Sequence, residues 1–198
     1  MYKLMYYDNI KTLKRGDRMA NIIDYINEFG TYDFEEFPFN SVDSLILSEL
    51  SYFLFGQHVP SIIEKSQGVK LHSFYNKEKI IKEFIDKSLE TKANAKLLEA
   101  LFHSRRFGGL LINYYDSQFS VIEETQFAAM VFHLGTIDYI AFRGTDATIM
   151  GWKEDFNMAI LDSIPAQSLA VEYLNKVIPH LNNDIYVGGH SKGGNLVV

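Results

Sequence analysis

The sequence predicts an α/β fold in which a mainly helical region precedes a β-sheet, and three observations support this prediction. Apolar residues recur at helical spacing through much of residues 19–108. Residues 109–198 instead contain short runs rich in β-branched and aromatic residues. A G-x-S-x-G motif at residues 189–193 follows the last of these runs. Residues 1–18 show no amphipathic order, and we expect them to be a disordered extension.

The helical region contains several amphipathic segments. Residues 41–55 place most of their large apolar side chains on one wide face. Asn76 is a plausible N-cap for a second helix, and a further helix repeats the pattern as far as Phe102. We interpret Arg105 and Arg106 as charges that complement the end of the last helix. These helices either cap the sheet or shape a substrate cleft.

Four strands are expected in the second half of the chain. Residues 110–115 read as the first, and residues 127–132 and 138–143 read as a hairpin joined through a Leu-Gly-Thr turn. Residues 165–178 form a helix with a proline in its first turn, and residues 184–187 form the strand that enters the G-x-S-x-G motif. This order of strand, hairpin, helix, strand and serine turn is that of the α/β-hydrolase fold.

Ser191, at the centre of the motif, is the candidate nucleophile. In a nucleophile elbow the serine occupies a sharp strand-to-helix turn that lifts its hydroxyl clear of the sheet. The backbone there is strained, and side chains at Gly189 and Gly193 would collide with the neighbouring strand and helix. An ordinary glycine-rich turn is the alternative. A Walker phosphate-binding loop is excluded because Lys192 has serine before it and glycine after it.

Thr145 and Lys192 are the candidate oxyanion-hole residues. Acyl transfer needs preorganised hydrogen-bond donors aimed at the developing oxyanion. One donor is normally the backbone N–H just after the nucleophile, which belongs here to Lys192. A second comes from a loop after an earlier strand, where Thr145 could give both its N–H and its hydroxyl. The alternative is that residues 144–146 form a polar turn with local side-chain hydrogen bonds.

Three segments resemble, in order and spacing, the lipase class 3 branch of the α/β-hydrolases. They are AFRGT at 141–145, GWKEDF at 151–156 and GHSKGG at 189–194. With Lys192 in the third segment and with residues 21–25 and 38–47, the chain looks closer still to an uncharacterised bacterial lipase-like family. The resemblance covers roughly residues 19–198. It implies an incomplete α/β-hydrolase sheet, the N-terminal half of the domain at residues 109–198, preceded by a mainly helical region at residues 19–108.

The resemblance also implies roles for the motif residues. It makes Ser191 the nucleophile, and Thr145 with the Lys192 N–H the oxyanion hole. Residues 146–151 occupy the place where lipases carry a lid.

Two further motif positions need separate interpretation. Trp152 and Asp155 match a W-x-x-D pattern, which we interpret as a structural anchor rather than a source of the catalytic acid. Lys192 departs from the leucine usual in lipases. A charge beside the nucleophile suits a polar or anionic substrate, or simply solvent.

The acid and base of the family's triad have no counterpart after Ser191. His190 is adjacent to the serine and is expected to pack against the elbow. The other histidines all precede it; they are His58, His72, His103, His133 and His180. A serine without a base is a weak nucleophile. We therefore expect this chain to be inactive alone, as the N-terminal part of a longer hydrolase or as an inactive relative.

Two functions are open at this point. The first is a serine ester hydrolase of the lipase or esterase type, with a small-molecule ester or a lipid-like substrate. The second is a non-catalytic lipase-like binding or scaffolding module. Self-association is also expected, because the strand at 184–187 would leave one edge of the sheet open to further pairing.

Composition excludes several classes of partner, cofactor and location. The net charge is −6 with no basic stripe, so nucleic acid is not an expected partner. The chain has no cysteine, which excludes disulfides, zinc–thiolate sites and a thiol nucleophile, and we expect no cofactor and no metal. No apolar run approaches the ~18 residues needed to span a bilayer, and no leader is recognisable. A cytoplasmic bacterial protein is expected.

Overall fold

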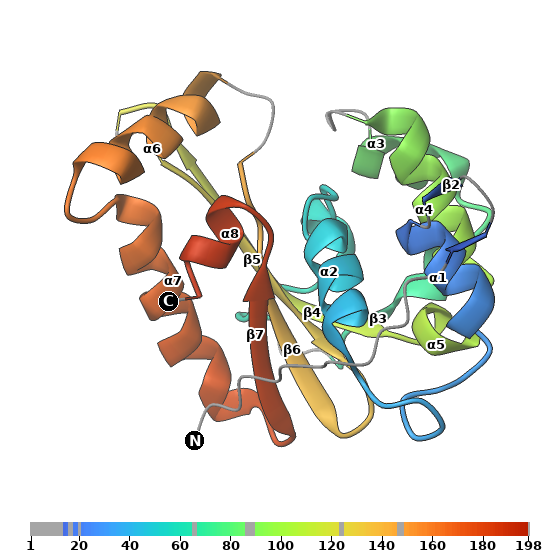
Figure 1. Ribbon diagram of the computed structural model, residues 1–198. Helices are drawn as coiled ribbons and strands as arrows, with labels where there is room; N and C mark the ends of the chain where they lie inside the picture. Colours follow the sequence, from blue (N-terminus) through green and yellow to red (C-terminus); the bar gives the residue numbers. More distant parts are fainter. Residues whose placement is uncertain are drawn as a thin grey trace.

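A five-stranded mixed sheet with strand order β3-β4-β5-β6-β7 forms the centre of the structure (Figure 1). The computed structural model describes residues 14–15, 18–19, 21–64, 67–85, 90–122, 125–145 and 149–197. Most of the expected extension at residues 1–18 therefore lies outside the described residues. Near its end, Lys14–Arg15 (β1) pairs antiparallel with Arg18–Met19 (β2), which extends one residue beyond it.

The predicted strands are confirmed, and several run longer than expected. The strands are β3 Val69–Lys70, β4 Leu111–Ser120, β5 Thr125–His133, β6 Ile137–Phe142 and β7 Asp184–Gly189. Strands β3 to β6 pair antiparallel, and β6 pairs parallel with β7. The expected hairpin is β5–β6, closed where the Leu134 N–H donates to Ile137 O at 2.8 Å. Among the described strands, β7 pairs with β6 alone.

Helices cover both faces of this sheet, as an α/β fold requires. The α-helices are α1 Ile22–Phe29, α2 Ser41–Leu50, α3 Glu78–Ile85, α4 Thr91–Phe102, α5 Arg105–Gly108, α6 Ile149–Ile160, α7 Pro165–Val177 and α8 Lys192–Asn195. Short 3-10 turns lie at Gly56–His58, Leu71–Phe74 and Ile178–His180. None of the described helices is both long enough and apolar enough to cross a membrane.

The helix expected over residues 41–55 is shorter than the sequence predicts. It begins at Ser41, after Asn40, whose side chain caps the first turn, and it ends at Leu50. The Ser51 hydroxyl donates to Ser48 O at 2.6 Å and competes with continuation of the helix. Beyond it, Phe53 and Phe55 are buried in the core from a non-helical backbone.

Side chains alternate between two hydrophobic clusters along the central strand. From β5, Met130 and Phe132 pack with the N-terminal helices, whereas Phe127 and Val131 pack with α7. In Figure 1, α2 lies on one face of β7, and α6 and α7 lie on the other side. The predicted α/β class is therefore confirmed, with the N-terminal helices as one layer over the sheet. The boundary at residues 108 and 109 stays a prediction.

The two arginines at the end of the helical region have different environments. Arg105 is exposed and pairs with Asp33 and Glu36. Arg106 is fully buried, and its guanidinium donates to both carboxylate oxygens of Asp43, at 2.8 and 2.5 Å. The interpretation as helix-end charge is therefore wrong for Arg106, which ties α5 to α2. Burial of this cation depends on its ionic partner.

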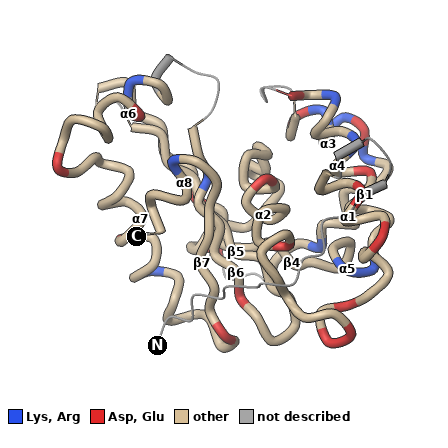
Figure 2. Tube along the Cα trace, viewed as in Figure 1, with Lys and Arg blue, Asp and Glu red and all other residues tan. Residues whose placement is uncertain are grey.

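Charged side chains of both signs are interspersed along the described chain. Figure 2 shows blue and red segments alternating over α3 and α4 rather than separating into two faces.

Candidate active site

The turn between β7 and α8 has the geometry expected of a nucleophile elbow. Ser191 caps α8 with a φ of 57° and a ψ of −126°. Its side chain is exposed. A positive φ is uncommon for a residue with a Cβ, and sparsely populated backbone conformations of this kind cost about 1–3 kcal/mol. The backbone strain predicted at this serine is therefore present.

The two glycines of the motif are required by close backbone approaches. A Cβ added to Gly189 would lie 2.3 Å from the carbonyl carbon of Gly193. A Cβ added to Gly193 would lie 2.2 Å from Phe142 O, at the end of β6. Neither obstacle is a flexible side chain, so the collisions predicted from the sequence are confirmed. The elbow, residues 189–193, is packed directly against β6.

Thr145 follows the strand beside the elbow. Parallel pairing sets Phe142 of β6 opposite Gly189 of β7, which places the chain after β6 at the same edge of the sheet as Ser191. The Thr145 hydroxyl donates to Asp155 Oδ1 at 2.6 Å. A hydroxyl has one proton to give. Of the two donors expected from Thr145, the hydroxyl therefore donates to Asp155. The backbone N–H remains the candidate donor to an oxyanion.

The two residues of the W-x-x-D pattern, Trp152 and Asp155, have different environments. Asp155 on α6 accepts the Thr145 hydrogen bond, as a structural anchor would. Trp152 is 62% exposed, so the anchor interpretation is wrong for it. Phe156, one turn further along α6, is 70% exposed. The segment expected to correspond to a lid, residues 146–151, falls partly outside the described residues, and α6 begins at Ile149.

The Lys192 side chain does not lie beside the nucleophile. It is 2% exposed, and its Nζ donates to Gln126 O on β5 at 2.6 Å. The side chain therefore points from the first turn of α8 into the protein, while Ser191 is exposed. The interpretation of Lys192 as a charge that faces a polar or anionic substrate is wrong. Its backbone N–H is the part of the residue that remains a candidate for the site.

None of the six histidines, all of them described, hydrogen-bonds to Ser191. His190 Nδ1 instead lies 3.1 Å from Tyr52 Oη and 3.6 Å from Glu49 Oε1. His133 Nδ1 lies 2.7 Å from Asp138 Oδ1, at the opposite end of β6. A histidine–aspartate pair exists in this chain, but the topology separates it from the serine.

Tyr52 and Glu49 enter the site from α2 and the turn after it, and the sequence analysis did not find them. Burial, and then the nearby Glu49 carboxylate, raise the pKa of Tyr52 to about 12, although the backbone amide of Gly144 acts in the other direction as a hydrogen-bond donor. Tyr52 and His190 are 138 positions apart in sequence. No local pattern marks such a contact, and only the packing of α2 on the sheet creates it.

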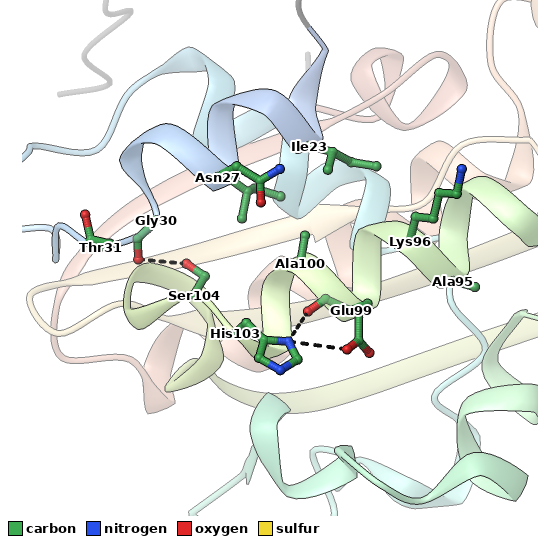
Figure 3. A pocket seen from close by; sticks show the side chains of 11 residues that line it. Ile23, Asn27, Gly30, Thr31, Ala95, Lys96, Glu99, Ala100, His103 and Ser104 are labelled. Atoms are coloured by element: carbon green, nitrogen blue, oxygen red, sulfur yellow. Dashed lines mark hydrogen bonds and ion pairs between the residues drawn. The ribbon is translucent and has the colours of Figure 1, made fainter.

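A cavity of about 610 Å³ lies in the N-terminal helical layer, away from the elbow (Figure 3). Figure 3 shows it between α1 and α4, with His103 and Glu99 in contact at its edge and Ser104 bonded to Gly30. None of the residues that line it belongs to the elbow or to the loop after β6. The cavity is therefore not the expected substrate cleft. Among the described residues, no cluster of three or more histidine or acidic side chains could hold a metal ion.

Comparison with known protein families adds one finding to this geometry. Residues 101–198 match the family described as Mbeg1-like. The Mbeg1-like family is lipase-like, in agreement with the resemblance in the motif residues. The Mbeg1-like segment contains Thr145, Ser191 and Lys192, whereas Glu49 and Tyr52 lie before it. No curated protein and no solved structure matches the chain.

Proposed function

We propose that this protein is a serine ester hydrolase of the lipase-like α/β-hydrolase class, with Ser191 as its nucleophile. The observation that carries the proposal is the backbone of Ser191, which holds a positive φ between β7 and α8 while its side chain is exposed. A strained turn of this kind presents a hydroxyl to a substrate. The substrate class is a small-molecule ester or a lipid-like ester.

The chemistry follows from the positions of the backbone donors. Ser191 Oγ attacks the ester carbonyl, its proton passes to a general base, and the carbonyl oxygen becomes an oxyanion. The N–H groups of Lys192 and Thr145 stabilise that charge. Collapse of the intermediate expels the alcohol, which takes the proton from the base, and leaves an acyl ester on Ser191. Water then repeats the sequence and releases the acid.

The general base is proposed to come from outside these residues. His190 is directed at Tyr52 and Glu49, and His133 is bonded to Asp138 at the far end of β6. A serine that lacks a base keeps its proton at neutral pH and reacts slowly. The 198-residue chain is accordingly expected to show little or no turnover by itself.

An ester-hydrolysis assay tests the proposal. Release of p-nitrophenol from short-chain p-nitrophenyl esters is measured with this chain and with the full product of its gene, each beside its Ser191→Ala variant. The proposal predicts serine-dependent turnover by the full product alone. Serine-dependent turnover by this chain would overturn the external base. Turnover that Ser191→Ala leaves unchanged would exclude Ser191 as the nucleophile.

A non-catalytic lipase-like binding module is the second candidate. The specific observation in its favour is that none of the six histidines, all of them described, is hydrogen-bonded to Ser191. This candidate predicts no serine-dependent turnover by the full gene product, so the same assay separates the two functions.

Self-association through β7 is proposed as a property of the chain in solution. Among the described strands β7 has one neighbour, β6, and its residues from Ile185 to Gly189 are only half-buried. An unpaired strand edge is a template for another strand. Light scattering should therefore give a mass above that of one chain, and a monodisperse monomer would count against the proposal.

A further inference from the structure

We propose that Tyr52 is a positioning residue of the reaction centre, and that its hydroxyl fixes the elbow relative to the loop that carries Thr145. The inference deepens the proposed function and rests on it for its effect on reaction rate. Its structural part can be tested on the protein whether or not Ser191 reacts.

One phenolic oxygen contacts both segments. Tyr52 Oη lies 3.1 Å from His190 Nδ1 and 3.4 Å from His190 O. The backbone of Gly144 lies against the same oxygen. A phenol has one proton to give and lone pairs that accept. The hydroxyl can therefore donate to His190 while it packs against Gly144, and it links two segments that are far apart in sequence.

The contact is too close to admit a side chain between the two segments. A Cβ added to Gly144 would lie 2.0 Å from Tyr52 Oη and 2.5 Å from His190 O. The glycine between Arg143 and Thr145 is thus required by direct approach of the tyrosine and the elbow.

The linked residues immediately precede the candidate oxyanion donors. Gly144 is followed by Thr145, and His190 is followed by Ser191 and then Lys192. The two N–H groups must converge on one oxygen, and loss of a single donor of this kind typically costs about 10²–10³ in rate. A bond that sets the spacing of the two segments therefore sets the geometry on which the donors depend.

Tyr52 is itself held in place by the layer beneath it. The preceding helix α2 is attached to the sheet through Ser44 Oγ and Ser48 Oγ, which lie 2.7 and 3.0 Å from the Tyr139 hydroxyl on β6. The hydroxyl keeps its proton at neutral pH, as a phenol does already at its ordinary pKa of about 10. The N-terminal helices thus contribute to the site through one rigidly mounted, neutral hydroxyl.

The test compares Tyr52→Phe with Tyr173→Phe. Both remove a tyrosine hydroxyl that makes hydrogen bonds, but the Tyr173 hydroxyl donates to Tyr114 O, on the α7 side of the sheet. Amide hydrogen exchange is followed by NMR at Gly144 and on β5. The proposal predicts that Tyr52→Phe speeds exchange at Gly144 about tenfold, with β5 unchanged, and that Tyr173→Phe leaves Gly144 unchanged. Unchanged exchange at Gly144 in Tyr52→Phe would overturn it.

Kinetics of fluorophosphonate labelling in the full gene product supply the second readout. Tyr52→Phe should lower the maximal labelling rate of Ser191 about ten- to hundredfold and leave the half-saturating probe concentration unchanged. An equal maximal rate in wild type and Tyr52→Phe would show that the hydroxyl does not position the donors, and would overturn the proposal. If the wild type is not labelled, the proposed function fails, while exchange at Gly144 still decides whether Tyr52 links the two segments.

Discussion

The two ends of the β6–β7 pair differ in what they carry: a candidate nucleophile lies at one end and a histidine–aspartate pair at the other. At one end Ser191 is exposed on a strained turn without a histidine partner. At the other end Asp138, 1% exposed, accepts from Asn183 and contacts His133 at 2.7 Å. The register pairs Asp138 with Ile185 and Phe142 with Gly189. At ~3.3 Å per residue, the two ends are about 13 Å apart along the strands.

This difference teaches that a close histidine–aspartate pair is not evidence of catalysis by itself. Asp138 joins the end of β5, the start of β6 and the loop before β7, which is a structural task for a buried carboxylate. At the elbow, the backbone is strained and the Ser191 side chain is exposed instead. The hydrogen bonds of Asp138 stabilise the fold at its end of the strand pair. The strained turn at Ser191 lowers stability and leaves a hydroxyl exposed at the other end.

The largest effect on stability is expected from adding a side chain at Gly193, where the elbow packs against β6. Gly193→Ala places a methyl group against Phe142 O and should destabilise the fold by about 3 kcal/mol. Gly109→Ala is the matched control, because no atom lies within 4 Å of the added carbon. Urea unfolding followed by circular dichroism measures both. Equal midpoints for the two variants would show that the elbow is not packed against β6 as described.

Removing the buried carboxylate tests whether the two ends are independent. Asp138→Ala leaves the Asn183 side chain and the His133 ring without their partner and should cost about 1–3 kcal/mol. Reactivity of Ser191 in the full gene product should not change. Asp184→Ala, at the exposed start of β7, is the control and should affect neither property. A loss of Ser191 reactivity in folded Asp138→Ala protein would contradict the separation of the two ends.

A glycine at the nucleophile position should stabilise the protein while abolishing its chemistry. Ser191→Gly relieves the positive φ and is expected to raise the free energy of unfolding by about 1 kcal/mol. Ser168→Gly, on the exposed face of α7, should lower it by about 0.5 kcal/mol. Denaturant unfolding distinguishes the opposite signs. Destabilisation by Ser191→Gly would argue that the turn is not strained.

The last effect concerns stability at alkaline pH and the tyrosine at the elbow end. The pKa of Tyr52 is raised from 10.0 to about 12, mainly by burial, so the unfolded chain releases this proton first as the pH rises. The corresponding stability is present below pH 10 and is lost between about pH 10 and 12. Tyr52→Phe should therefore lose less stability than the wild type across this interval. Parallel pH profiles of the two proteins would contradict the buried position of the hydroxyl.

Local chemistry made the elbow predictable from the sequence. The G-x-S-x-G spacing, the preceding β-branched run and the steric demands at Gly189 and Gly193 concern neighbouring residues, and the structure agrees with each. The position of Thr145 after a strand beside the elbow was also predictable, because hairpin and crossover signals set the strand order.

Contacts between distant segments were not predictable in this way. The sequence does not indicate where the side chain of the lysine after Ser191 points. In the structure, the Lys192 amine donates to a backbone carbonyl on β5. Arg106 was interpreted as a charge that complements a helix end, whereas the fold buries it against Asp43. Tyr52 carries no motif at all, and its contact with the elbow depends on how α2 packs on the sheet.

Fluorophosphonate labelling followed by peptide mapping is the most direct test of Ser191 as the nucleophile. The measurement compares this chain, the full product of its gene, and the Ser191→Ala variant of each. The account predicts a single labelled peptide that contains Ser191 in the full product, and no labelling of this chain or of either variant. A full product that remains unlabelled, or that is labelled at another serine, would contradict the assignment.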